Sequence, residues 1–204
     1  MRTPTAVTVL AVLATTPLGA QQGERHLQSG DWSLSFGVEP SYLTTNSGSF
    51  ALWRMISGRV NAGLGITFGG SVDQYGQEDS VVTGHLSSST WSLRIEPAVK
   101  WYLRVPRRVA PYPYFAAGPT FRWHRYASSG GTDDRGYAYG GSGTAALGVD
   151  WLPIRWLSVG GHTGFRVEAT RDREQYVGSI RPQVIQDRVS VQSFTSNVFV
   201  QIYF

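Results

Sequence analysis

The chain has 204 residues, of which 41% are hydrophobic, and it carries 18 Lys and Arg residues against 14 Asp and Glu residues. This length is typical of a single domain, and the small positive surplus, with no basic run longer than two residues, argues against a nucleic-acid-binding protein. The lack of cysteine excludes a disulfide scaffold, a thiolate metal site and a lipoprotein anchor.

The first 20 residues have the three parts of a secretory signal peptide. Arg2 supplies a basic start, residues 6–14 form an apolar core, and Leu18-Gly19-Ala20 offers a cleavage site. The apolar core is shorter than the roughly 20 residues of a membrane-anchoring helix, and no later stretch approaches that length. We therefore expect three parts of the chain: a signal peptide at 1–20, an N-terminal segment at 21–30 and one β domain at 31–204.

The 24 glycines and 10 prolines divide the chain into short runs in which apolar and polar residues alternate. A period of two is typical of β-strands with one apolar face. We expect eight such strands: about 31–43, 50–57, 60–70, 89–105, 112–126, 142–152, 156–170 and a last one that ends at Phe204. The second is the weakest, with Ala51, Trp53 and Met55 predicted outside and Arg54 inside.

The connections between these strands alternate in length. Those after the second, fourth and sixth strands are short, while 71–88, 127–141 and 171–190 are long and polar. Short turns at one end and long loops at the other are typical of outer-membrane barrels, whose strand number is even. The sequence therefore predicts an all-β fold, an eight-stranded antiparallel up-and-down transmembrane β-barrel.

Three of the strands carry pairs of aromatic residues ten positions apart: Trp32 and Tyr42, Trp91 and Trp101, and Phe194 and Phe204. Ten strand residues span roughly 33 Å, which a tilt of about 40° projects onto roughly 25 Å of barrel axis. That height matches the apolar band between the two aromatic girdles of a membrane barrel. We therefore expect these residues to form the girdles.

The opposite faces of the strands carry charged residues: Glu39, Arg54, Arg94, Glu96, Lys100, Arg122, Asp150, Arg166 and Glu168. A soluble lipocalin-like barrel holds its charges outside, whereas an Arg or Lys facing lipid near the midplane costs about 2 to 4 kcal/mol. We therefore expect the charged face to point into the lumen. Because an eight-stranded barrel is just wide enough inside for side chains, ion pairs would plug it; a conducting pore is the alternative.

Pro40, Pro97 and Pro119 lie in the middle of predicted strands, where each deletes a ladder donor. A β-bulge or a local bend is the simplest expectation at these positions. They are the main departure of the sequence from regular strand chemistry.

With a signal at 1–20, eight alternating strands, inward charges and a terminal Tyr203-Phe204, the mature chain resembles the small outer-membrane β-barrels of the OmpA and OmpX type. The resemblance implies that the C-terminal strand, through Val200, Ile202, Tyr203 and Phe204, is read by the barrel-assembly machinery. We expect a monomer in the outer membrane of a Gram-negative type of cell, exported through the general secretory route. Its expected partners are outer-membrane lipid and lipopolysaccharide, and no periplasmic peptidoglycan-binding domain is expected.

Three functions remain open at this point. We prefer a non-catalytic structural or surface-interaction role, because no catalytic site is visible and fold alone decides nothing. A lipid A-modifying enzyme is the second, yet His124 and His162, the histidines inside predicted strands, both fall on the inward face, away from a lipid substrate. A small-solute channel is the third. We expect no enzymatic activity and no cofactor.

Two polar stretches fall in the predicted long loops. Asp133-Asp134 lacks the spacing of an EF-hand calcium loop, so we expect a solvated loop and no metal site there. Arg171-Asp172-Arg173-Glu174 is also expected to be solvated. Its arginines are nevertheless suited to contact lipopolysaccharide phosphates in the outer leaflet.

Overall fold

The computed structural model describes residues 27–39, 47–76, 85–104, 106, 108–128, 133–175 and 184–204. The predicted signal peptide at 1–20, most of the segment at 21–30, Pro40 and Tyr42 lie outside these ranges. Within the described ranges, no helix is long and apolar enough to cross a membrane.

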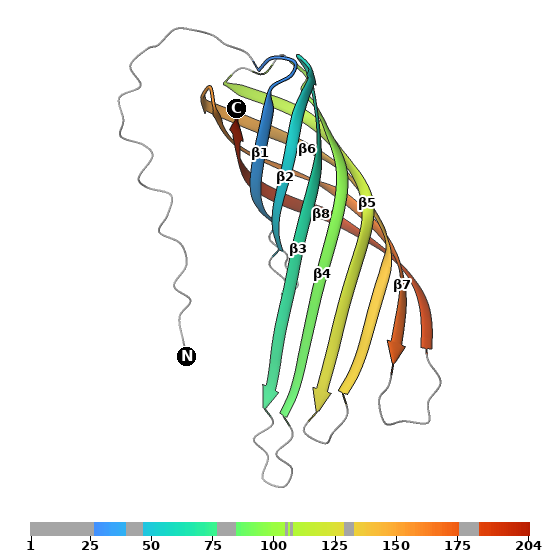
Figure 1. The fold of residues 1–204 in the computed structure, drawn as a ribbon. Helices are drawn as coiled ribbons and strands as arrows, with labels where there is room; N and C mark the ends of the chain where they lie inside the picture. The colour runs from blue at the N-terminus through green and yellow to red at the C-terminus, as the bar shows by residue number, and fades with distance from the viewer. Residues whose placement is uncertain are drawn as a thin grey trace.

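Eight antiparallel strands close into one barrel, in which consecutive strands pair and β1 pairs with β8 (Figure 1). The strands are β1 (Trp32–Glu39), β2 (Ser47–Ser57), β3 (Val60–Gly76), β4 (His85–Trp101), β5 (Val109–Ser128), β6 (Asp133–Ile154), β7 (Leu157–Gln175) and β8 (Val184–Tyr203). The C-terminus lies at the end of the barrel that carries the short turns, where the Tyr203 N–H donates to the Trp156 carbonyl. The predicted all-β, eight-stranded, up-and-down architecture is confirmed.

The hydrogen-bonded register sets the tilt of the strands. Following paired residues once around the barrel from Gly160 of β7 leads back to β7 at Thr170, ten residues further along (170 − 160). The path runs through Phe199, Gly37, Ser49, Thr67, Arg94, Thr120 and Gly140. An offset of ten residues at about 3.3 Å each, over eight strands about 4.8 Å apart, corresponds to a tilt of about 41°. A barrel of this size has an interior that side chains alone can fill.

Side chains alternate between a polar interior and an apolar exterior. In β1, Ser33, Ser35 and Glu39 are buried, whereas Phe36 and Val38 are more than half exposed. Other strands expose large apolar side chains on the outer wall in the same way: Leu64, Phe68, Val99, Phe115, Leu147, Phe165, Val198 and Val200. Folding in this barrel therefore places apolar groups outside and polar groups inside.

Strand β2 faces the opposite way from the prediction. Ala51, Trp53 and Met55 are buried in the interior, whereas Arg54 is exposed on the outer wall. Arg54 pairs with Trp32 of β1, and its guanidinium carbon lies 5.3 Å from the centre of the Trp32 ring. Arg54 is therefore not part of the charged lumen. It lies at the short-turn end, where a long cationic side chain can extend past an aromatic ring toward water.

The pattern of β2 is ambiguous because both of its faces are apolar. Phe50, Leu52 and Ile56 occupy the outward face and are each at least 40% exposed. Inside the barrel, the indole N–H of Trp53 donates to the Ser35 hydroxyl at 2.9 Å. That hydrogen bond gives the buried Trp53 side chain a polar partner that a lipid-facing position would not provide.

Strands β3 to β8 extend toward the long connections beyond their predicted ends (Figure 1). At its other end, β4 stops at Trp101 rather than at the predicted residue 105, and β2 begins three residues before its predicted start. The predicted loops 71–88, 127–141 and 171–190 are largely strand. The Asp133-Asp134 pair begins β6, and the stretch 171–174 lies within β7, which corrects the loop prediction for both. A strand segment without an apolar face loses the period-two pattern while its backbone ladder continues, so sequence patterning underestimates its length.

The β4–β5 ladder keeps its register across Pro97 and Pro119. The pairs on either side follow one register: Arg94 with Thr120, and Ala98 with Ala116. The bulge expected at these two prolines is therefore not formed. The ladder pairs between these positions are interrupted instead, because proline has no N–H to donate.

A bulge occurs instead in β8. The register shifts there by one residue: Gly164 pairs with Thr195, whereas Phe165 pairs with Ser193. Phe194 is the inserted residue, so the outward positions change from odd numbers such as Val191 to even numbers such as Val198. The side chain of Phe194 lies outside the described part of the chain, and its place in an aromatic girdle stays a prediction.

The chain before β1 turns under the barrel and closes its short-turn end. Gly30 has a φ of 99°, a left-handed conformation that favours glycine, and its N–H donates to the Met55 carbonyl at 2.7 Å. This turn places Leu27 in a buried apolar cluster at the base of the lumen. The other members of that cluster are Met55, Tyr102, Ala110, Tyr112, Phe199 and Tyr203.

The inward position of Trp53 leads to a stability prediction. Trp53→Ala should lower the free energy of unfolding by about 3 to 5 kcal/mol, because it leaves a cavity in a filled interior. Urea unfolding in lipid vesicles, followed by fluorescence, measures the loss. Leu52→Ala, on the neighbouring outward position, is the matched control and should cost less. A larger loss for Leu52→Ala would contradict the assigned facing of β2.

Candidate functional site

Ten charged side chains face the lumen among those that the structure describes. They are five bases and five acids: Arg94, Lys100, Arg122, Arg166, Arg188, Glu39, Glu96, Asp150, Glu168 and Asp172. Their formal charges cancel. Eight of the nine predicted lumenal charges belong to this set, and Arg54 does not. Asp172 and Arg188 were missed because the sequence places them in a loop rather than on a strand face.

Lys100 and Asp150 form the pair nearest the short-turn end. The Lys100 ammonium lies 3.2 Å from Asp150 Oδ2 and donates to Gln201 Oε1 at 2.9 Å. The Tyr102 hydroxyl donates to the same carboxylate at 2.6 Å. Both charged side chains are at most 1% exposed. An ion pair so far from water is tolerable only where further hydrogen bonds satisfy its remaining polar atoms, as they do here.

Three aromatic rings surround the same ammonium group. Lys100 Nζ lies 3.9 Å from the ring centre of Phe199, 4.9 Å from that of Tyr112 and 5.1 Å from that of Trp53. The negative faces of the rings attract a cation, most strongly when water is excluded. Lys100 is the only lysine of the chain. Its compact charge suits a space bounded by three rings better than a planar guanidinium would.

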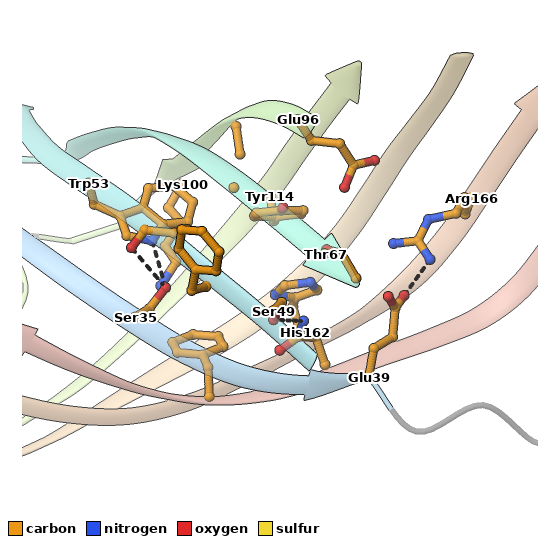
Figure 2. Close-up of a pocket in the computed structure, with 16 residues that line it drawn as sticks. Ser35, Glu39, Ser49, Trp53, Thr67, Glu96, Lys100, Tyr114, His162 and Arg166 are labelled. Carbon is orange, nitrogen blue, oxygen red and sulfur yellow. Dashed lines mark hydrogen bonds and ion pairs between the residues drawn. The ribbon is translucent and has the colours of Figure 1, made fainter. Parts of the chain in front are cut away.

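A second cluster lies further along the lumen around Glu39. Both carboxylate oxygens of Glu39 accept hydrogen bonds, one from Arg94 and the other from Arg166. Figure 2 shows the contact with Arg166. Arg166 also donates to the Thr144 hydroxyl at 3.1 Å, and Arg94 lies 4.0 Å from the Glu96 carboxylate. Glu39 thus joins guanidiniums from β4 and β7, on opposite sides of β1, across the barrel axis.

Two further pairs continue the series toward the far end of the barrel. Arg122 donates to Glu168 at 2.8 Å, and Arg188 lies 3.8 Å from Asp172. Exposure rises along the series, because the Arg188 side chain is 60% exposed while Lys100 is buried. The lumen therefore contains a ladder of ion pairs that is dry at the short-turn end and opens to water at the other.

A cavity of about 50 Å³ lies between the two charge clusters, lined by Ser35, Ser49 and His162 among others (Figure 2). The imidazole of His162 stacks on Tyr114, with ring centres 4.1 Å apart. Its Nδ1 atom and the Asn197 side-chain oxygen have no hydrogen-bond partner among the described residues. A polar cavity of this size holds water in proteins, but it is far too small for an organic solute.

The two histidines considered as catalytic lie at different levels of the barrel. His162 pairs with Gly148 in its middle, whereas His124 pairs with Gly136 near the far end of β5. The His124 ring lies so close over Gly136 that a Cβ at that glycine would be 1.9 Å from Nε2. Within the described ranges, no three His, Asp or Glu side chains are placed to hold a metal ion.

The predicted girdle residues that the structure describes lie on the outer wall. Trp32, Trp91, Trp101 and Phe204 are between 39% and 74% exposed. Of the predicted C-terminal signal, Val200, Ile202 and Phe204 face outward, while Tyr203 is buried in the base of the lumen. Phe204 closes the barrel, because its N–H donates to the Trp32 carbonyl at 2.9 Å.

Several lumenal residues escape a search for charges alone. Tyr102, Tyr112, Gln201 and Trp53 complete the environment of Lys100, and Leu27 closes the base. The sequence does place Tyr102 and Gln201 on inward faces. The usable signal was therefore a tyrosine or amide on the same face as a charge, since such groups satisfy buried ions.

Removal of the Glu39 charge tests the cluster that Glu39 forms with Arg94 and Arg166. Glu39→Gln should lower the free energy of unfolding by about 3 to 5 kcal/mol, because two buried guanidiniums lose their shared counter-ion. Urea unfolding in vesicles measures this change. Asp187→Asn, which breaks the exposed Arg171–Asp187 pair, is the control and should leave stability unchanged. Equal effects of the two substitutions would contradict the importance of the buried cluster.

No protein-family model matches the chain, and no curated protein is detectably similar to it. Among solved structures, a major outer membrane protein from Thermus thermophilus matches with a TM-score of 0.57 and 13% identity, over 87% of this chain and 100% of that chain. Two others match less closely. They are Ail, the attachment invasion locus protein of Yersinia pestis (TM-score 0.46, 11% identity, 87% and 100% of the chains), and Outer Membrane Protein W of E. coli (TM-score 0.44, 13% identity, 87% and 99%). The first likeness shows that this chain has the fold of a small outer-membrane β-barrel, as predicted.

Proposed function

We propose that the chain is an integral outer-membrane protein whose barrel is plugged by its own side chains and that acts without catalysis, through its outer wall and its extended strands. The observation that carries this proposal is a lumen packed with side chains, in which the charges of the described residues balance. Its charges are paired within the protein, and its base is closed by apolar and aromatic side chains.

The outer wall supports a membrane location. Large apolar side chains cover it between two groups of exposed aromatic residues: Trp32, Trp101, Trp151 and Phe204 toward the short turns, and Trp91, Trp123 and Tyr139 toward the other end. The ten residues from Trp91 to Trp101 project onto roughly 25 Å of axis at the tilt of the strands. Soluble monomers rarely expose contiguous apolar surface of this extent.

Orientation and export follow from the same layout. In outer-membrane barrels the short turns face the periplasm and the longer connections face outward. The predicted signal peptide at 1–20 would direct the chain to the secretory route, and the C-terminal strand ending at Phe204 would be read by the barrel-assembly machinery.

The arrangement of charge favours a plug over a channel. Selectivity filters built from side chains use rings of one charge sign, whereas this lumen alternates acids and bases that neutralise one another. Leu27, Tyr102 and Tyr203 also pack together across the base of the lumen.

The position of the histidines favours a non-catalytic role over lipid modification. His162 is packed flat on Tyr114 inside the barrel, and a lipid substrate would approach from the outer wall. His124 also lies on the inward face of its strand, where its ring covers Gly136 and is turned away from lipid.

Planar-bilayer recordings test the plug. Purified, refolded protein should give no steady stepwise conductance at either polarity, with a wide multi-stranded porin as the positive control. Heat-modifiable gel mobility in detergent verifies that the sample contains folded barrels. Steady currents from the folded protein would overturn the plug in favour of a channel.

Incubation with lipid A, followed by mass spectrometry, tests the absence of catalysis. We expect the lipid mass to remain unchanged. A mass loss that disappears in His124→Ala or His162→Ala would establish a lipid-modifying enzyme and defeat the proposal.

A further inference from the structure

The outer wall of the barrel is hollowed over strands β3 to β7. The hollow has a volume of about 690 Å³ and is lined almost entirely by apolar atoms. This volume lies within the range of about 300 to 1,000 Å³ that small-molecule sites occupy. Its floor is formed by small residues, Ala62, Ala117, Gly143 and Ala145, and Phe115 and Phe165 form its walls.

The register explains the shape of the hollow. Ala145 lies between Phe115 of β5 and Phe165 of β7, so the rings rise on both sides of a methyl group. The next outward position, Gly143, carries no side chain, and a Cβ built there would meet no atom within 4 Å. The hollow is thus a gap in an otherwise bulky outer wall, at the depth that faces hydrocarbon in the proposed function.

Four arginines lie on the same face, further toward the long connections. Arg125 of β5 is the register partner of Arg135 of β6, and Arg171 and Arg173 follow on β7. From Val167 in the hollow to Arg171 is four residues, about 13 Å along the strand. Arg173 is six residues, about 20 Å, from Val167, and Arg125 and Arg135 are each eight residues, about 26 Å, from Ala117 and Gly143. At the tilt of the strands, the four arginines therefore lie about 10 to 20 Å of barrel axis from the hollow, where lipid headgroups begin.

Neighbouring side chains orient two of these arginines. Arg173 donates to the Tyr137 and Tyr139 hydroxyls at 3.3 and 3.5 Å. Arg171 donates two hydrogen bonds to the Asp187 carboxylate, of 2.6 and 3.0 Å. Both guanidiniums are thereby held at the surface of the sheet, within reach of an anionic headgroup.

We propose that this face of the barrel binds a phosphorylated, multiply acylated glycolipid of the lipid A type, with its phosphates on the arginines and an acyl chain in the hollow. The inference rests on the proposed membrane location. Guanidinium groups bind phosphate through paired hydrogen bonds, and several of them suit a headgroup with more than one phosphate. The apolar hollow on the same face favours a lipid over a free polyanion, because a soluble anion would leave the hollow unused.

Native mass spectrometry of the folded protein in detergent, titrated with bisphosphorylated lipid A and with its dephosphorylated form, measures the binding. Arg125→Gln/Arg173→Gln should weaken binding of the phosphorylated lipid by roughly tenfold or more, and leave the dephosphorylated lipid unaffected. Gly143→Leu should weaken binding of both lipids, because it places a side chain in the hollow at a position where an added Cβ meets no atom within 4 Å.

Two substitutions elsewhere on the outer wall serve as matched controls. Arg54→Gln removes an exposed arginine at the other end of the barrel, and Ser196→Leu enlarges an outward residue of β8 away from the hollow. Both should bind lipid A as the parent protein does. Heat-modifiable mobility should be retained by every variant, which separates loss of binding from loss of folding.

Three outcomes would overturn the inference. They are unchanged binding in Arg125→Gln/Arg173→Gln, unchanged binding in Gly143→Leu, and equal affinity for a soluble sulfated oligosaccharide, which would make the cluster a polysaccharide site. Each of these leaves the plugged barrel standing. A sample without heat-modifiable mobility would instead defeat the membrane barrel itself.

Discussion

Closure of eight strands at an offset of ten residues is the constraint on which the rest of this structure depends. Closure satisfies the backbone through one continuous ladder, and the offset fixes an interior that side chains alone can fill. Each residue then has two options, the outer wall or that narrow interior. An apolar outer wall forces the polar residues inward, which inverts the usual arrangement of a folded protein and removes the hydrophobic core as the main determinant of its interior.

Where the narrow interior excludes bulk water, its buried charges in turn require partners. Each buried ion loses its hydration, and only a partner at hydrogen-bond distance compensates for this. The ladder achieves that with pairs that join distant strands: Lys100 of β4 with Asp150 of β6, and Glu39 of β1 with Arg94 and Arg166. Such contacts tie the barrel across its axis as well as around its wall. The same contacts that make the lumen stable also neutralise the charges with which it could attract a permeating ion.

How much of this could be read from the sequence depends on whether polar and apolar residues separate cleanly. They do in β4, where Arg94, Glu96 and Lys100 alternate with apolar residues, and there the facing was predictable. They do not separate in β2, where the large apolar residue Trp53 lies inside the barrel. Its indole N–H donates to Ser35 and its ring faces the Lys100 ammonium, and both of these partners are remote in sequence. The ion-pair partners were equally out of reach, since Glu39 and Arg166 are 127 residues apart and meet only through the register of the whole barrel.

In the proposed plugged barrel, the lumenal charges that the structure describes cancel, which moves the question of selectivity to the outer wall. There, a sheet gains stability from cross-strand packing of bulky side chains, and glycine or alanine in that position gives up such contacts. Gly143 and Ala145 nevertheless lie among the bulky side chains that border the hollow, where larger residues would add packing. Further toward the long connections, the same face carries arginines of three neighbouring strands, of which Arg171 is already paired with Asp187. An apolar hollow, with guanidinium groups further along the same face, suits one kind of molecule: an amphiphile with an anionic head and an apolar tail.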